Sequence, residues 1–525
     1  MTAGFVPAVN APAGNVRRRP LRRLPLTAAA AILGLLLSSC SVIAPEKPVA
    51  TSAAPEIVGE VPAELADFYT QEVTWSSCNG GFQCAEVKVP MDYAAPKKDS
   101  IKLSVIRLPA TGKRLGAMLV NPGGPGGSGV NMVKDGGKSY FSAKLRGAYD
   151  VVGFDPRGVQ RSAPVKCLDD AQMDASRQLD FDLSTDAGFA AGEAETKRQT
   201  ALCQQNSGPD LGHIDTVSSA RDMDVLRAVV GDPKLNYMGF SYGTKLGATY
   251  AGLFPDRVGR FSLDGALDPS LDIDQVSMGQ AVGFENALRA WAADCLSGAD
   301  CPVSGSVDNA MAQIRDLQGV YAANPQQTPS GRVVTGAEFM NAIAFTMYST
   351  DLWEPLAGAL KQAFAGDASG MLLLADFGAD RDSDGKYNSN TAAAFTAINC
   401  LDYPMNSDLG HMRGQAALLK KAAPTFGELL GYSGLSCKYW PVPAVGKPAP
   451  ISAPGAGPIL VVGTTGDPAT PYAWSEALAK QLESGVLVTW EGQGHTAYGR
   501  SNECLTSVVD NYFVDGKVPA AGTRC

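Results

Sequence analysis

The sequence contains only three histidines in 525 residues, and no two of its eleven cysteines are spaced as C-x-x-C. A zinc site made of His and Cys ligands is therefore not expected, and we predict neither a metal ion nor an organic cofactor. Basic residues are also few, since 44 Lys and Arg stand against 53 Asp and Glu, giving a net charge of −9. Because phosphate groups are bound by clustered Lys and Arg, this composition argues against nucleic acid as a partner and favours a cationic ligand.

The first 39 residues have the pattern of an export signal. A basic cluster, Arg17–Arg23, precedes fourteen mostly apolar residues, Leu24–Leu37, which are too few to span a bilayer as a helix. The small residues before Cys40 resemble a bacterial lipobox, in which the cysteine is acylated and becomes the new N-terminus. We therefore expect a signal peptide over 1–39, a lipidated Cys40 and a flexible tether over 40–62. The protein is then anchored by lipid in the cell envelope, at the outer face of the cytoplasmic membrane. The sequence leaves open whether the Sec or the twin-arginine route exports it.

An even number of cysteines remains once Cys40 is set aside, as expected for disulfides outside the cytosol. Pairing in sequence order is the simplest arrangement, although spacing alone does not determine connectivity. The ten cysteines are Cys78, Cys84, Cys167, Cys203, Cys295, Cys301, Cys400, Cys437, Cys504 and Cys525.

The body of the chain alternates between strand and helix patterns, which predicts an α/β fold with a mostly parallel sheet covered on both faces. Strands are expected at 101–108, 117–121, 150–154, 235–238 and 260–263, and helices at 221–230 and 244–253.

A second region, from 269 to 456, is helical in pattern and rich in Ala, before strand patterns return at 458–462 and 486–490. We interpret it as a large helical cap domain at the carboxyl edge of the sheet, where α/β ligand sites lie. It is inserted before the strand at 458–462, which precedes the residue identified below as the candidate catalytic acid. The core is then expected in two parts, 63–268 and 457–525.

The main chemical motif is Gly239-Phe240-Ser241-Tyr242-Gly243, a G-x-S-x-G sequence between a predicted strand and a predicted helix. In the α/β-hydrolase fold this motif forms a strained turn that exposes the serine hydroxyl above the sheet. We therefore predict Ser241 as a catalytic nucleophile.

A serine nucleophile needs a base, and in this fold the chain order is Ser, acid, His. His213 precedes the serine, and His411 lies in the expected cap, where a solvated or capping role fits better. His495 follows the last predicted strand in a Gly-rich loop, so it is predicted as the general base.

The acid is expected at the end of a strand between the serine and the histidine. Asp467 follows the strand at 458–462 in a Gly-Asp-Pro turn and is predicted to orient the imidazole. Asp264 and Asp268, after the strand at 260–263, are alternatives, because some hydrolases take their acid from that position.

Acyl transfer also needs donors for the oxyanion. One is expected from the backbone N–H of Tyr242 and the other from Gly123 or Gly124, in the Gly-rich loop 121–129. Glycines of the same loop also spell G-x-G-x-x-G, a dinucleotide fingerprint, but its prolines and the export signal favour the hydrolase interpretation.

The assembled motifs resemble the tripeptidyl aminopeptidase and proline iminopeptidase group of α/β hydrolases, and within it the cell-envelope serine proteases of mycobacteria. The resemblance covers most of the mature chain. It rests on the Asn-Pro-Gly-Gly-Pro-Gly loop at 121–126, Asp-Pro-Arg-Gly at 155–158, residues 239–244, Ala-Ile-Asn-Cys-Leu-Asp at 397–402, Asp-Pro-Ala-Thr-Pro at 467–471, Gly-His-Thr at 494–496, and the late Cys504 and Cys525.

This resemblance implies release of short peptides, typically tripeptides, from the free N-termini of peptide or protein substrates. Such an enzyme needs an anion to hold the substrate ammonium, for which Asp402 is the first candidate and Glu285 the second. Thr470 is expected to line the pocket. An esterase or lipase acting on envelope lipids with the same triad, and a non-catalytic binding lipoprotein on a hydrolase scaffold, are the alternatives. The sequence does not indicate the oligomeric state.

Overall fold

The computed structural model describes residues 50–51, 60–78 and 80–525. The expected signal peptide, Cys40 and most of the tether lie outside these residues. Within them, no helix combines the length and apolar character needed to cross a membrane.

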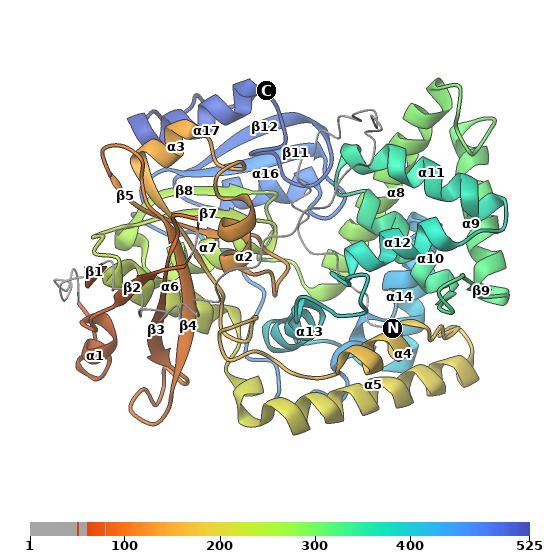
Figure 1. Ribbon diagram of the computed structural model, residues 1–525, viewed down its shortest axis with the longest axis horizontal. Coiled ribbons are helices and arrows are strands. Elements are labelled where there is room, and N and C mark those ends of the chain that lie inside the picture. Colours follow the sequence, from red (N-terminus) through yellow and green to blue (C-terminus); the bar gives the residue numbers. More distant parts are fainter. Residues whose placement is uncertain (1–49, 52–59, 79) are drawn as a thin grey trace, which may run out of the picture.

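One large twisted sheet forms the core, on the left of Figure 1, with strand order β1-β2-β3-β4-β6-β5-β7-β8-β11-β12-β13. The strands from β6 to β12 in this order run parallel, and β4 pairs antiparallel with β6. The expected α/β fold with a mostly parallel sheet is therefore confirmed. The strands are β1 Ala50–Thr51, β2 Thr74–Ser77, β3 Gln83–Pro90, β4 Ser100–Leu108, β5 Gly116–Asn121, β6 Tyr149–Phe154, β7 Leu235–Phe240, β8 Val258–Asp264, β11 Ile459–Gly466, β12 Gly485–Gln493 and β13 Thr523–Arg524.

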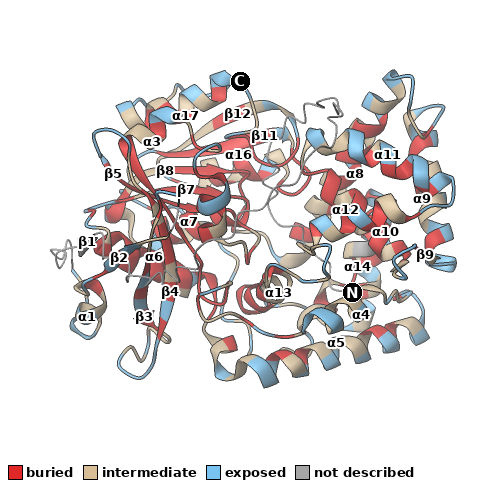
Figure 2. Cartoon of the chain, in the orientation of Figure 1, coloured by how far each residue is buried: buried red, intermediate tan, exposed pale blue. Residues whose placement is uncertain are grey.

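Apolar side chains alternate between the two faces of this sheet, so each face packs against its own helices. Leu119 faces a cluster that includes residues of α6, α7 and α16, whereas Met118 and Val120 face a cluster that includes α3 and α17. The parallel strands are buried on both sides, as Figure 2 shows in red. The helices are α3 Ala143–Ala148, α6 Thr216–Val229, α7 Tyr242–Leu253, α16 Tyr472–Gln481 and α17 Glu503–Asp515.

The helices between β8 and β11 form a second body with its own apolar core, on the right of Figure 1. Trp291, Phe339 and Leu360 are among its buried side chains. The helices of this stretch are α8 Ile273–Ser297, α9 Val307–Ala323, α10 Gly336–Thr346, α11 Trp353–Phe364, α12 Ser369–Gly378, α13 Thr391–Asp402, α14 Leu409–Ala422 and α15 Gly427–Leu430. Of these, α13 buries its apolar residues in the cluster of the sheet rather than in that of the helical body.

A segment that the sequence placed in the core also packs against this helical body. It contains α4 (Asp170–Arg177) and the long α5 (Asp186–Ser207), which runs along the bottom of Figure 1. Arg177 pairs with Glu338 at 2.6 Å and Asp376 at 2.9 Å, both in the helical body. Leu183 and Phe189 share an apolar cluster with Met412, Tyr432 and others. The segment therefore contacts the helical body through Arg177, Leu183 and Phe189, and the sheet cluster through Cys203.

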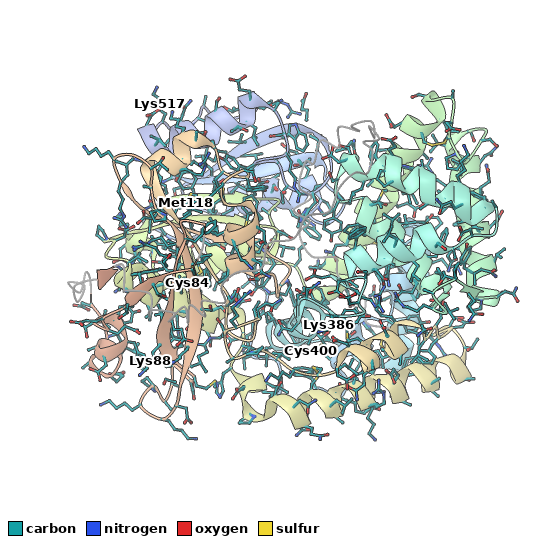
Figure 3. The ribbon with its side chains drawn as sticks, in the orientation of Figure 1. Cys84, Lys88, Met118, Lys386, Cys400 and Lys517 are labelled. Carbon is teal, nitrogen blue, oxygen red and sulfur yellow. A yellow bond between two sulfur atoms is a disulfide. The ribbon has the colours of Figure 1, made fainter. Side chains whose placement is uncertain are left out.

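All ten cysteines of the described chain form disulfides, and they pair in sequence order. The bonds are Cys78–Cys84, Cys167–Cys203, Cys295–Cys301, Cys400–Cys437 and Cys504–Cys525. Cys400, labelled in Figure 3, lies on α13, which crosses between the sheet and the cap.

Candidate active site

The turn between β7 and α7 holds Ser241 in a backbone conformation that L-residues rarely adopt, with φ 56° and ψ −125°. The flanking glycines make the turn possible. A Cβ at Gly239 would lie 2.4 Å from the carbonyl oxygen of Gly243, and one at Gly243 would lie 2.8 Å from the carbonyl oxygen of Asn121. Only glycine fits at either position, so the motif is required by packing as well as by strain.

His495 and Asp467 form a buried pair at the ends of β12 and β11. Nδ1 of His495 lies 2.8 Å from Oδ1 and 2.9 Å from Oδ2 of Asp467. The carboxylate also accepts the main-chain N–H groups of Ala469, Thr470 and Thr496. Proton donation from Nδ1 to this carboxylate leaves Nε2 as the basic atom, and Nε2 is buried without a partner in the described residues.

Ser241 and His495 both contact the end of β8 and the residue that follows it. The N–H of Ser241 donates to the carbonyl oxygen of Asp264 at 2.9 Å. A Cβ on the next residue, Gly265, would lie 3.3 Å from Cε1 of His495. Within the described residues, no hydrogen bond joins the Ser241 hydroxyl to Nε2. In free enzymes this bond is often long and tightens only with substrate.

The cap shields the histidine from solvent through Tyr348, just after α10. The carbonyl oxygen of Tyr348 accepts the N–H of His495 at 2.9 Å, and the two rings pack edge to face with centroids 5.2 Å apart. A base held in a dry site has stronger electrostatic interactions with its neighbours than one in water.

The two alternative acids do not bond to the histidine. Asp264 accepts the main-chain N–H groups of Ala497 and Tyr498, and burial raises the pKa of its carboxyl to about 7. Asp268 accepts hydrogen bonds from the N–H and hydroxyl of Ser270 and from the side-chain amide of Gln481. Of the three candidate carboxylates, Asp467 is the one that the structure brings to the imidazole.

The Gly-rich loop lies directly against the nucleophile. A Cβ at Gly123 would stand 2.8 Å from the Cβ of Ser241 and 3.1 Å from the backbone nitrogen of Tyr242. The N–H of Gly123 is already used, because it donates to Oδ1 of Asn121 at 2.9 Å. Gly124 is therefore the donor that remains to join Tyr242, whose N–H has no intrahelical acceptor at the start of α7. Asn121, the first residue of the loop, holds this geometry and was not singled out from the sequence.

The dinucleotide alternative does not fit this loop, because α13 packs on it. A Cβ at Gly126 would lie 2.9 Å from the carbonyl oxygen of Thr391, and the Thr391 hydroxyl donates to the Gly126 carbonyl oxygen at 3.2 Å. Gly126 therefore serves the close packing of α13 on the loop rather than the approach of a pyrophosphate.

Ser241 lines a cavity of about 120 Å³ between core and cap, called here the catalytic cavity. None of its lining residues is charged, and Thr470 is among them. The Thr470 hydroxyl lies 3.3 Å from Nδ1 of His495, so this side chain touches both the cavity and the base.

Asp402 does not offer a free carboxylate for a substrate ammonium, in contrast to the expectation from the sequence. Nζ of Lys245 lies 3.0 Å from its Oδ2, and Thr216 donates both its N–H and its hydroxyl to it. Burial lowers the pKa of Lys245, but the charge of Asp402 outweighs this effect and the net pKa is raised. The pair is neutral overall, and it ties α13 to α7.

Glu285 is also buried, and its two oxygens accept the N–H and hydroxyl of Thr425 at 2.8 and 3.0 Å. Thr425 lines a larger cavity of about 780 Å³, called here the carboxylate cavity because Asp180, Asp182 and Glu428 also line it. Two cations, Arg315 and Lys420, line it too. Leu183 and Tyr432 line both this cavity and the catalytic cavity, so the two are neighbours.

Comparison with known proteins identifies the family of this chain. The model of the family described as TAP-like protein matches residues 423–525. The serine protease Hip1 of Mycobacterium tuberculosis is 36% identical over 479 residues, which cover 87% of this chain and 91% of that protein. Carboxylesterase B of the same species is 37% identical over 519 residues, covering 96% and 99%. Tripeptidyl aminopeptidase of Streptomyces lividans is 33% identical over 469 residues, covering 86% of each chain.

Proposed function

This chain belongs to the actinobacterial family of TAP-like serine hydrolases with the α/β-hydrolase fold, and we propose that it releases short peptides, chiefly tripeptides, from free N-termini. The enclosure of Ser241 carries the proposal. The residue is 6% exposed, and the catalytic cavity lies between core and cap. A loop in the middle of a folded protein does not reach such a site, whereas a chain end does.

The mechanism follows from the geometry. Nε2 of His495 takes the proton of the Ser241 hydroxyl, which attacks the peptide carbonyl carbon. The N–H groups of Tyr242 and Gly124 hold the oxyanion, and His495 returns the proton to the departing amine. Water activated by the same imidazole then releases the acyl group from the serine. Asp467 orients the ring and stabilises its charged form.

The substrate ammonium is assigned to the carboxylate cavity, because the catalytic cavity has no charged lining residue. Glu428 pairs with Lys420 at 3.1 Å, and Arg315, which also lines the cavity, donates to the Thr425 hydroxyl at 3.3 Å. Asp180 and Asp182 form no ion pair with a Lys or Arg of the described chain, so three carboxylates face two cations in this cavity. Burial raises the pKa of Asp180, so its ionised form gains from a cation nearby. Glu285 lies behind Thr425 in the same wall and adds negative potential.

The test compares tripeptidyl p-nitroanilides with a free or an acetylated N-terminus on the purified mature chain. We expect acetylation to abolish turnover, and Asp180→Asn to raise KM for the free-amine substrate about tenfold with little change in kcat. Equal hydrolysis of the free and acetylated substrates would contradict an aminopeptidase.

Ester hydrolysis by the same triad is the second candidate. The Carboxylesterase B relatives match the larger share of this chain, and the uncharged catalytic cavity suits an acyl chain as well as a peptide. Turnover of short acyl esters that exceeds peptide turnover by orders of magnitude, with no dependence on a free amine, would favour it.

The site of action is proposed to be the cell envelope, with attachment through lipid on Cys40. Five disulfides within the described residues support an oxidising compartment. Replacing Cys40 by alanine is expected to move the protein from the membrane fraction to the soluble fraction. Unchanged membrane association would contradict the lipid anchor.

A further inference from the structure

A third cavity, of about 370 Å³, borders α13 next to the catalytic cavity. It is called here the α13 cavity. Its walls come from the loop after β6, from α4 and α5, from α13 and from the segment around Trp440. Thr396 and Ser436 line both the α13 cavity and the catalytic cavity. The two cavities are therefore neighbours that meet at these two small side chains.

Two disulfides fix the shape of this region. Cys167–Cys203 stands in the wall of the α13 cavity, and Cys400–Cys437 joins α13 to the chain beside Ser436. A cavity held open by covalent bonds is preformed and does not need to be opened by a ligand.

Besides Arg177 the walls carry Lys166 and Asp170, one charge of each sign, so their chemistry indicates a ligand without net charge and with a hydrogen-bond acceptor. Arg177 is neutralised by Glu338 and Asp376, and the Asn390 amide already donates to the carbonyl oxygens of Gly158 and Val165. By contrast, the indole N–H of Trp440 is buried and has no acceptor in the described residues. A buried donor without a partner is costly, and a ligand oxygen would satisfy it.

The sheet order tells which part of a substrate this cavity faces. The departing amine must receive its proton from His495, which follows β12, so the leaving part of the substrate lies on that side of Ser241. The loop that forms one wall of the α13 cavity follows β6, and β6 and β12 lie on opposite sides of β7. The α13 cavity is therefore on the acyl side.

From these observations, and resting on the proposed peptidase function, we infer that the α13 cavity is a specificity pocket for the acyl part of the substrate. It takes one large uncharged side chain with an acceptor oxygen, such as Tyr or Gln. The main chain of the same acyl part leads toward the carboxylate cavity, where its ammonium is held.

The experiment uses free-amine tripeptidyl p-nitroanilides in which each position in turn is Ala, Leu, Gln or Tyr. The wild-type mature chain is expected to prefer Gln or Tyr over Ala at one position by at least tenfold in kcat/KM. Ala393→Phe, which fills the cavity from α13, is expected to remove this preference. Its kcat/KM for the all-Ala substrate is expected to stay within about twofold of the wild-type value. Ala417→Phe, on the exposed face of α14 away from the three cavities, is the matched control.

Trp440→Phe keeps an aromatic side chain and removes only the N–H. It is expected to lower kcat/KM about fivefold for the Gln or Tyr substrate and to leave the Leu substrate unchanged. The proposal is overturned if the wild type shows no size preference at any position, or if Ala393→Phe lowers all substrates equally and Trp440→Phe affects none. If the wild type cleaves no tripeptidyl anilide at all, the proposed function itself fails, which is a distinct result.

Discussion

Two buried carboxylates, Asp264 and Asp467, end or follow neighbouring strands, yet they differ in what they hold. The strands β8 and β11 are paired, and Asp264 lies opposite Val462. Both side chains accept main-chain N–H groups from the loop that carries His495: Asp467 from Thr496, and Asp264 from Ala497 and Tyr498. Asp467 also reaches Nδ1 of the imidazole. One carboxylate therefore orients the base, and the other fixes the backbone that presents it.

The comparison predicts its largest effect for Asp467→Asn. The amide has a similar shape but favours the wrong tautomer of His495, so kcat is expected to fall by about 10³ to 10⁴. Asp264→Asn is the matched control and is expected to cost less than about tenfold in kcat, because Asp264 does not touch the ring. Steady-state hydrolysis of a tripeptidyl anilide measures both. Equal losses in the two variants would show that the carboxylates share one role.

A third buried carboxylate, Asp402, differs from the other two because it forms an ion pair with Lys245 as well as hydrogen bonds with Thr216. Lys245→Met leaves this carboxylate buried without its counter-charge, so the free energy of unfolding is expected to fall by about 3 to 5 kcal/mol. Asp402→Asn in the same chain is expected to restore most of the loss. Urea unfolding of the single and double variants measures it, and a loss below about 1 kcal/mol for Lys245→Met would contradict this role.

The buried carboxyl of Asp264 is expected to make the free energy of unfolding depend on pH. Burial raises the pKa of its carboxyl in the folded state to about 7, above its ordinary value in the unfolded chain. The folded state therefore binds this proton more tightly than the unfolded state. Its contribution to stability is complete below about pH 4 and is lost as the pH rises through 7, by up to about 4 kcal/mol.

Asp264→Asn mimics the protonated carboxyl and cannot ionise. The difference in unfolding free energy between variant and wild type is therefore expected to move in favour of the variant from pH 5 to pH 8. A difference that stays constant over this range would mean that Asp264 does not titrate there.

The smallest effect is expected at Thr470, whose hydroxyl lies near Nδ1 of His495 while its N–H bonds to Asp467. Thr470→Val keeps the backbone bond and the shape, so kcat/KM is expected to drop about threefold to tenfold. Thr465→Val, on the same strand end but exposed, is the control. A loss as large as that of Asp467→Asn would assign the hydroxyl a direct part in the reaction.

The sequence predicted the elements and residues whose signals are local. The strands from 101–108 to 486–490 end within a few residues of their observed bounds, because each alternates or is fully apolar over its own length. The serine, base and acid could be assigned because a motif, a scarce residue type and a chain order each limit the choice.

Features that depend on distant contacts could not be predicted in this way. The role of Asp402 depends on Lys245, 157 positions earlier, and Asn121 acts through a side-chain bond to the loop that it begins. The position of α4 and α5 against the cap depends on ion pairs such as Arg177 with Glu338. None of these partners is marked by spacing or composition.

The most direct test of the central claim is covalent labelling with a fluorophosphonate, followed by mass spectrometry of the mature chain. The account predicts a single adduct on the Ser241 hydroxyl, none on Ser241→Ala, and slow labelling of His495→Ala. An active preparation that takes no label, or takes it on a different residue, would contradict Ser241 as the nucleophile.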